Sequence, residues 1–202
     1  ESRYASFDNV EVELWGIMFV VFPLTYVAYA SNGSRLVAGG VILSADHERV
    51  LMISSTDKRR WIIPKGGVEL DEVEDYSKAA IRETWEEAGV DGRVAKYLGK
   101  INDHRMIKTL GCEGNSKSFP PLASSVEYAD PNNFITKDGT KLVPRSEYHF
   151  YEMALVKIYT EWPEKHKRDR HWFDYATAKR ELEKNDGLEL LEALEKSSIV
   201  KD

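Results

Sequence analysis

The sequence contains a single cysteine, Cys112, among its 202 residues. No disulfide can therefore form within the chain, and such low cysteine usage is typical of a reducing compartment. We accordingly expect the protein in the cytoplasm or the nucleus. No nucleophile motif surrounds Cys112, so we interpret it as a bystander thiol.

An excess of positive charge is also lacking. The chain has 28 Lys and Arg residues against 34 Asp and Glu residues, a formal net charge of −6 at pH 7. This balance argues against a broad nucleic-acid surface, and we expect no stable nucleic-acid partner. Two local basic clusters, residues 58–60 and 165–171, stand out against the acidic background. Such clusters are usually solvated, but a polyanionic ligand nearby would give them a binding role.

Long apolar runs are rare, and the one uncharged stretch covers residues 14–34. A membrane span needs roughly 20 apolar residues, which this stretch approaches. Gly16, Pro23 and a polar end weaken that interpretation, and the acidic residues before the stretch are atypical of a secretory signal. We therefore favour a buried or partner-covered segment in a lead-in of unknown role, with a membrane anchor as the alternative.

The strongest functional signal lies in residues 64–90. A Gly66–Gly67 turn precedes a helical stretch that ends at Gly89, where a helix C-cap belongs. Glu83, Glu86 and Glu87 are spaced three and four apart, so they share one helix face. Like charges at this spacing destabilise an isolated helix, which indicates a bound cation. Oxygen ligands suit Mg²⁺, whereas a solvated acidic face is the alternative interpretation.

Hydrophobic patterns predict the other elements. Strands are expected at residues 36–43, 50–55, 92–101, 147–156 and 172–174, the first two as a hairpin, and helices at 175–184 and 188–196. Residues 103–144 are rich in Gly, Ser, Pro, Asn and Asp and are too long for an ordinary connection. We interpret them as a loop insertion in a single domain that spans residues 35–202.

Residues 82–90, Arg-Glu-Thr-Trp-Glu-Glu-Ala-Gly-Val, resemble the second half of the Nudix box, REUxEExGU, with Thr84 at the first U position. In the full family pattern, a glycine, five residues, a glutamate and seven residues precede the Arg-Glu pair. Counting back from Arg82 selects Glu74, but six residues separate Gly67 from Glu74. The turn before the helix is therefore expected to be at least one residue longer than the pattern.

Several further segments resemble one Nudix branch, the diphosphoinositol polyphosphate phosphohydrolases, and its fungal members in particular. They are residues 35–43, 53–69, 144–152, 166–173 and 190–202. The resemblance implies an α/β protein, a Nudix α/β/α sandwich with a mixed β-sheet. It also implies a monomeric, Mg²⁺-dependent pyrophosphohydrolase, with Mn²⁺ as a substitute. The substrates would be diphosphoinositol polyphosphates, cleaved at the diphosphate, and diadenosine polyphosphates, cleaved at the phosphoanhydride bonds.

The resemblance also implies roles for individual residues. Glu83 and Glu87 would ligate the metal beside Gly67, Glu86 would act as the base or a further ligand, and Arg82 would orient the carboxylates. Substrate-binding residues would be Arg35, Ser54, Ser55, Thr56, Lys65, Gly66, Arg145, Arg168 and Arg170. Thr56 stands where animal relatives have a basic residue, so its contact is expected to be weaker.

Two alternatives keep part of this interpretation. The substrate could be another nucleotide polyphosphate or capped RNA, with Tyr148, Trp162 or Trp172 as a clamp for the nucleobase. The chain could also be a non-catalytic module that binds phosphorylated ligands, although such a module would be expected to lack the metal glutamates.

Overall fold

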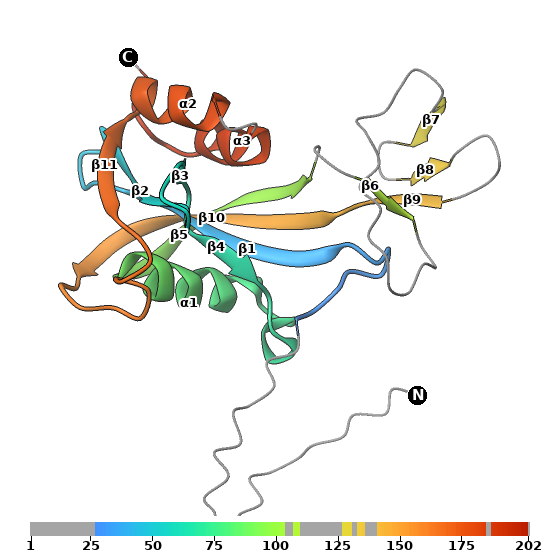
Figure 1. The fold of residues 1–202 in the computed structure, drawn as a ribbon, viewed down its shortest axis with the longest axis horizontal. Helices are drawn as coiled ribbons and strands as arrows, with labels where there is room; N and C mark the ends of the chain where they lie inside the picture. The colour runs from blue at the N-terminus through green and yellow to red at the C-terminus, as the bar shows by residue number, and fades with distance from the viewer. Residues whose placement is uncertain are drawn as a thin grey trace, which may run out of the picture.

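A computed structural model describes residues 27–103, 107–109, 127–130, 133–135, 141–184 and 187–201. Its main sheet has seven strands (Figure 1). They are β1 (Arg35–Leu43), β2 (Arg49–Ser54), β3 (Trp61–Ile62), β4 (Lys65–Gly67), β5 (Val90–Asn102), β10 (Ser146–Ile158) and β11 (Arg170–Asp174). The order along the sheet is β11-β2-β1-β10-β5, while β3 pairs with β2 and β4 pairs with β1.

The sheet is mixed, because β1 runs parallel to β10 and antiparallel to β2 and β4. All but the first residue of β1 are buried, as a central strand covered on both faces requires. The predicted hairpin is confirmed by the pairing of Ile42 with Leu51 and of Leu43 with Val50.

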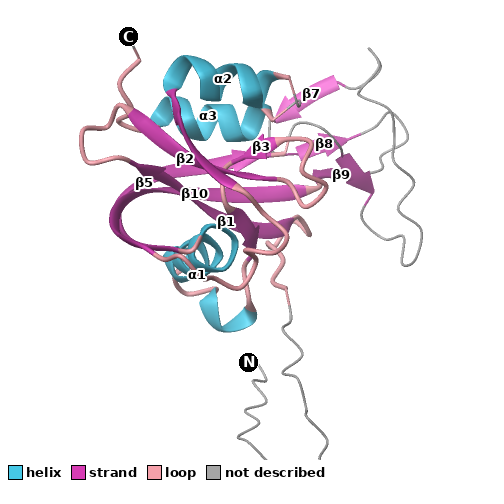
Figure 2. Ribbon diagram, turned by 60° about the vertical axis from the view of Figure 1, so that its left-hand side comes forward, coloured by secondary structure: helices cyan, strands magenta, loops and turns pink. Residues whose placement is uncertain are grey.

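Helices cover both faces of this sheet (Figures 1 and 2). Helix α1 (Tyr76–Ala88) lies on one face, while α2 (Tyr175–Glu183) and α3 (Leu188–Lys196) lie on the other. Ala79 and Ala80 are fully buried, so α1 packs closely against the sheet. Leu182 and Leu194 join the core cluster on the opposite face. The α/β/α sandwich predicted from the sequence is confirmed.

Local signals fix both ends of α1. The Asp75 side chain caps the first turn by accepting a hydrogen bond from the backbone N–H of Ser77. At the other end, Gly89 adopts a left-handed conformation (φ 63°) and its N–H donates to the carbonyl of Trp85. Because a residue with a Cβ adopts this conformation only with strain, glycine ends the helix here as predicted.

A second, four-stranded sheet lies within the segment predicted as a loop insertion. It comprises β6 (Ile107–Thr109), β7 (Glu127–Asp130), β8 (Asn133–Ile135) and β9 (Lys141–Pro144), in the order β6-β9-β8-β7. Figure 1 shows this sheet beyond the ends of β1 and β10. Strands of three or four residues are too short to show a recognisable alternation, which explains why the sequence did not predict them.

Residues 14–26 of the uncharged stretch lie outside the described residues, and residues 27–34 pack against the domain. Val27 bridges to Glu69, Tyr29 bridges to Arg35, and Ala28 is buried in the cluster that contains Ala79 and Ala80. Among the described residues, no helix is both long enough and apolar enough to cross a membrane.

Candidate active site on the acidic helix

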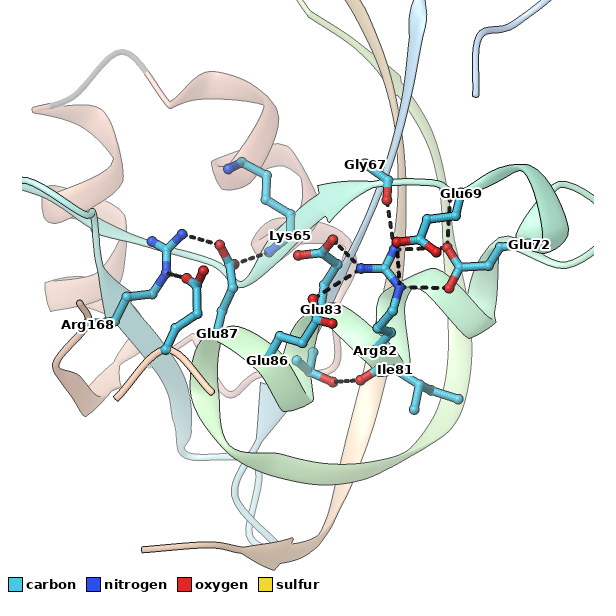
Figure 3. A network of polar contacts seen from close by, with 12 residues as sticks. Lys65, Gly67, Glu69, Glu72, Ile81, Arg82, Glu83, Glu86, Glu87 and Arg168 are labelled. Atoms are coloured by element: carbon cyan, nitrogen blue, oxygen red, sulfur yellow. Dashed lines mark hydrogen bonds and ion pairs between the residues drawn. The ribbon is translucent and has the colours of Figure 1, made fainter. Parts of the chain in front are cut away.

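The three glutamates predicted to share a face lie in the last turns of α1, next to the short strand β4. Glu83 and Glu87 are buried, whereas 40% of the Glu86 side chain is exposed. In Figure 3 the three carboxylates, called the carboxylate row below, lie between Arg82 and Arg168, with Glu83 and Glu86 at the Arg82 end and Glu87 at the Arg168 end. One carboxylate therefore faces solvent while the other two are enclosed.

Gly66 of β4 makes room for this row. A Cβ added at Gly66 would lie 2.1 Å from the carboxylate of Glu83, which is far inside van der Waals contact. The carboxylate therefore rests directly on the bare backbone of the strand. Any residue other than glycine at this position would displace it.

Arg82 connects the helix to β4 and to the turn between them. Its Nη1 donates to Glu83 Oε1 at 2.7 Å and to Glu86 Oε2 at 3.2 Å. Its Nη2 donates to the carbonyl oxygen of Gly67 at 2.8 Å. Arg82 thus contacts two of the three glutamates, and its orienting role stays a prediction.

The glutamate that completes the Arg82 network is Glu72, not the Glu74 selected by counting. Nε and Nη2 of Arg82 each donate to the Glu72 carboxylate at 2.9 Å, and Glu72 is buried. Glu74 is exposed. The 3-10 turn η1 (Leu70–Glu72) ends at Glu72, which also accepts the N–H of Glu69, so the turn points this side chain at the helix. The only sign of this partner in the sequence was the presence of a second glutamate, Glu72, two residues before Glu74.

Arg168 occupies the other end of the carboxylate row. Its guanidinium donates to Glu87 Oε1, to Glu164 Oε2 and to the carbonyl oxygen of Ser54. The second oxygen of Glu87 accepts the backbone N–H of Lys65 at 2.8 Å. Both oxygens of Glu87 therefore have protein partners, and the Arg168 side chain is only 10% exposed.

Burial sets the protonation of the two enclosed carboxylates. Removal from water raises the pKa of Glu83 to about 7, although Arg82 opposes the shift. Burial likewise raises the pKa of Glu87, and the nearby Arg168 opposes it. Desolvation disfavours the charged form, and a cation beside the pair would restore it.

The donor set suits a hard divalent cation. Three glutamate carboxylates offer only oxygen ligands, the type that Mg²⁺ and Mn²⁺ prefer, and two of them are already desolvated. Within the described residues, however, no three acidic or histidine side chains converge in a way that could hold a metal ion. The carboxylates are instead drawn toward Arg82 and Arg168. Metal binding would therefore require them to exchange these partners.

Lys65 and Arg35 lie on the other side of β4 from Glu83. Side chains alternate along a strand, so Lys65 and Gly67 point away from the face that Gly66 turns toward the helix. A Cβ added at Gly67 would lie 2.7 Å from Nη2 of Arg35, which locates the guanidinium against this strand. The two glycines thus leave a bare strip between the carboxylates and the cations.

The remaining predicted phosphate contacts fall into two groups. Arg145 is exposed, and its carbonyl accepts the N–H of Arg35, so the two residues adjoin at the ends of β10 and β1. Ser54 and Ser55 are buried; the hydroxyl of Ser54 accepts the N–H of Asp169, and the hydroxyl of Ser55 donates to Asp57. Thr56 is exposed at the tip beside them.

Arg170 has the contacts of a structural residue. It donates to the carbonyls of Ala88 (2.6 Å) and Tyr159 (2.5 Å), and it stacks over the ring of Trp162. The last carbonyls of a helix lack partners within the helix, and Arg170 supplies one for α1. We therefore leave Arg170 out of the candidate site, because a basic run in the sequence does not show which cation faces which neighbour.

The three aromatic residues considered as nucleobase clamps are engaged elsewhere. Tyr148 is buried and stacks on Phe150, while Trp172 is half-buried against the core. Trp162 donates its Nε1–H to the carbonyl of Glu87, and the guanidinium of Arg170 stacks over its ring. None of these rings is presented as an open stacking surface.

Comparison with known proteins agrees with this architecture. The chain is 46% identical over 63 residues to diphosphoinositol polyphosphate phosphohydrolase 3-alpha of Mus musculus, a match that covers 31% of this chain and 37% of the relative. It is 28% identical over 130 residues to the chloroplastic Nudix hydrolase 21 of Arabidopsis thaliana, covering 64% of this chain and 48% of the relative. The chain therefore matches less than half the length of these relatives.

A solved structure shows the same fold. The NUDIX hydrolase from Nitrosomonas europaea superposes with a TM-score of 0.51 at 13% identity, covering 81% of this chain and 87% of that one. The sequence profile of the NUDIX domain matches residues 33–194, which include α1, the whole main sheet and most of α3. The chain therefore belongs to the Nudix family.

Proposed function

We propose that this protein is a Mg²⁺-dependent pyrophosphohydrolase that cleaves the diphosphate of diphosphoinositol polyphosphates and the phosphoanhydride bonds of diadenosine polyphosphates. The observation that carries the proposal is the bare Gly66–Gly67 strip, with the carboxylate row on one side and Lys65 and Arg35 on the other. A polyphosphate laid across this strip meets a cation-binding face and a basic face together.

Glu83 and Glu87 would hold the divalent cation, since their buried carboxylates flank the strip. When bound, the cation neutralises charge on the phosphoryl oxygens and makes water a stronger acid. Glu86 reaches solvent and takes the proton of the attacking water on a carboxylate oxygen, a role that typically contributes roughly 10²–10⁴-fold to the rate. Arg82 holds Glu86 and Glu83 in position.

The basic residues would bind the phosphates that do not react. Arg35 lies against Gly67, Lys65 belongs to β4 itself, and Arg145 adjoins Arg35 just before β10. Cations on three separate segments suit a ligand that carries phosphates in several directions. Together these cations make the electrostatic potential positive at this site, although the chain as a whole has a net charge of −6. The match to a diphosphoinositol polyphosphate phosphohydrolase supports this substrate class, as does the engagement of Tyr148 and Trp162 elsewhere.

The second candidate substrate is a nucleotide polyphosphate or capped RNA, and a different group of aromatic side chains supports it. Trp61, His171 and Phe173 pack edge to face, with ring centroids 5.0 Å apart for Trp61–Phe173 and 4.9 Å for His171–Phe173. His171 is exposed, and Trp61 is the partner of Ser54 in the pairing of β3 with β2. A nucleobase could stack here while its phosphates reach Lys65.

Phosphate release from a diphosphoinositol pentakisphosphate in the presence of Mg²⁺ tests the proposal. The wild type should release phosphate, whereas Glu86→Gln should lose turnover and keep most of its affinity for the ligand. Glu74→Gln is the matched control, because Glu74 is an exposed glutamate outside the network. Cleavage of diadenosine hexaphosphate alone would move the substrate class to nucleotides. Binding of both ligands without cleavage would identify a non-catalytic module.

A further inference from the structure

Arg168 is enclosed between two carboxylates that belong to different parts of the chain. It meets Glu87 of the acidic helix through Nη2 and Glu164 through Nε, the latter at 2.6 Å. The side chains of Glu87 and Arg168 are largely buried, whereas that of Glu164 is half-buried. The pair of Arg168 and Glu87 is therefore shielded from solvent, and electrostatic interactions there are stronger than at the surface.

Both oxygens of Glu87 already have a protein donor, so a bound cation would share an oxygen with one of them. One of its oxygens accepts the backbone N–H of Lys65, and Arg168 holds the other. Each carboxylate oxygen has two lone pairs, so the obstacle to a cation at Glu87 is the positive charge of Arg168 and not the number of hydrogen bonds. Two positive groups at one oxygen repel, so cation and guanidinium exclude each other there.

Glu164 makes such an exchange possible. An arginine that lost its only carboxylate in a buried position would be left with an uncompensated charge, which is strongly unfavourable. Glu164 binds Nε, a different nitrogen from the Nη2 that faces Glu87. The guanidinium can therefore release Glu87 and still be paired.

The loop that carries both residues is fixed to the helix. The N–H of Glu164 donates to the carbonyl of Glu86, and the N–H of Arg168 donates to the carbonyl of Glu164. Trp162 adds its Nε1–H to the carbonyl of Glu87. Because the backbone is tied to α1 at these points, the exchange needs only a rotation of the Arg168 side chain.

We propose that Arg168 is the resident counter-ion of Glu87, that it yields Glu87 to the divalent cation, and that its freed Nη2 then turns to a substrate phosphate while Glu164 holds Nε. Glu164 is thus a positioning residue. The inference rests on the proposed function, because it takes Glu87 as a ligand of the cation. If Arg168 acts in this way, the ion pair between Arg168 and Glu87 breaks when the cation binds.

Titration with Mn²⁺ alone, followed by electron paramagnetic resonance and calorimetry, tests the exchange without substrate or turnover. Arg168→Gln should bind Mn²⁺ roughly tenfold more tightly than the wild type, because no ion pair has to break. Lys167→Gln is the matched control: it removes the same charge from the same loop, and Lys167 pairs with Glu164 at 3.1 Å. Its Mn²⁺ affinity should stay within about twofold of the wild type.

Glu164→Gln should weaken Mn²⁺ binding, since Arg168 would then have Glu87 as its only carboxylate. In an Arg168→Gln background the same substitution should have no effect. This double-mutant cycle isolates the contact from a general change of field. The difference between the wild type and Arg168→Gln should also persist at about 1 M salt, where the screening length is about 3 Å.

Unchanged or weaker Mn²⁺ binding by Arg168→Gln would overturn the exchange, and an equal effect of Glu164→Gln in both backgrounds would overturn the role of Glu164. If Mn²⁺ fails to bind the wild type, the metal assignment in the proposed function fails as well. If Mn²⁺ binds the wild type and Arg168→Gln equally, only the exchange fails. Should Arg168→Gln not fold, Arg168→Lys, which cannot span both carboxylates as a fork, should also bind Mn²⁺ more tightly.

Discussion

The carboxylate of Glu83 lies so close to Gly66 that a single added carbon atom on the glycine would fall 2.1 Å from it. The carboxylate of Glu83 thus occupies the space that a side chain at position 66 would fill. Gly66→Ala should therefore push Glu83 out of the row. We expect a loss of turnover of roughly 100-fold, the usual cost of a misplacement near 1 Å.

Gly92→Ala is the control for this substitution. A Cβ at Gly92 would meet the flexible end of Met153 at 3.3 Å, which can shift slightly. Turnover by Gly92→Ala should remain close to that of the wild type. Equal activity of Gly66→Ala and Gly92→Ala would show that the position of Glu83 does not matter for the reaction.

Glu72 and Glu74 lie two residues apart in the chain but should respond differently to substitution. Glu72→Gln removes a charged partner from Arg82, and hydrogen bonds to charged groups typically contribute about 1.5–3 kcal/mol. We expect a loss of this order in the free energy of unfolding, together with lower turnover, because Arg82 also holds Glu83. Urea denaturation measures the first effect and phosphate release the second.

Glu74→Gln should leave both quantities unchanged, because Glu74 is exposed and outside the Arg82 network. The opposite result, a larger effect at Glu74 than at Glu72, would restore the glutamate selected by counting along the family pattern.

This pair also shows where prediction from sequence succeeds and where it stops. The end of the helix was predicted from local chemistry, since the left-handed Gly89 acts within one turn, whereas the Asp75 cap at its start was identified only in the structure. The choice between Glu72 and Glu74 depended on the path of the η1 turn, which periodicity does not encode. Counting by a fixed spacing selected Glu74 because nine residues, rather than the seven of the family pattern, separate Glu72 from Arg82.

Contacts between distant segments were harder still to predict. Arg168 and Arg170 belong to the same basic run, yet Arg168 faces Glu87 and Arg170 faces the end of the helix backbone. Charge alone does not distinguish them, because the partner is chosen by how the loop crosses α1. The short strands within residues 103–144 were missed for the different reason that they carry too few residues to show a pattern.

A pH-dependent contribution to stability is expected from Glu147. His149 donates to its carboxylate at 3.0 Å and Lys100 lies 3.4 Å away; these partners, His149 above all, lower the pKa of Glu147. A carboxyl group whose pKa is lower in the folded state binds fewer protons when folded. Its contribution is therefore complete above its unfolded pKa, near 4.5, and is lost as the pH falls through the folded value.

Glu147→Gln should accordingly be less stable than the wild type at pH 7, by about 1–2 kcal/mol. The difference should shrink as the pH is lowered below about 4.5. Thermal or urea unfolding across this range measures it. A difference that stays constant from pH 7 to pH 3 would mean that the charge of Glu147 contributes nothing and that only its shape matters.

Arg145 of the proposed basic face and Arg170, which lies outside the candidate site at the end of α1, should separate substrate binding from stability. Arg145 is exposed at the start of β10 beside Arg35, so Arg145→Gln should raise the KM for a polyphosphate several-fold and change the unfolding free energy by less than about 0.5 kcal/mol. Arg170 instead supplies hydrogen bonds to the carbonyls of Ala88 and Tyr159. Arg170→Gln should cost about 2–4 kcal/mol of stability, because these charged hydrogen bonds are partly buried.

Measured well below its melting temperature, Arg170→Gln should keep the KM of the wild type. The comparison requires unfolding curves and initial rates for both variants under the same conditions. A raised KM for Arg170→Gln without loss of stability would place this guanidinium on the substrate and contradict its role at the end of α1. The reverse outcome for Arg145, a stability loss with unchanged KM, would remove it from the basic face. Since each substitution removes one positive charge, a general electrostatic effect would change both KM values alike, and only different contacts can separate them.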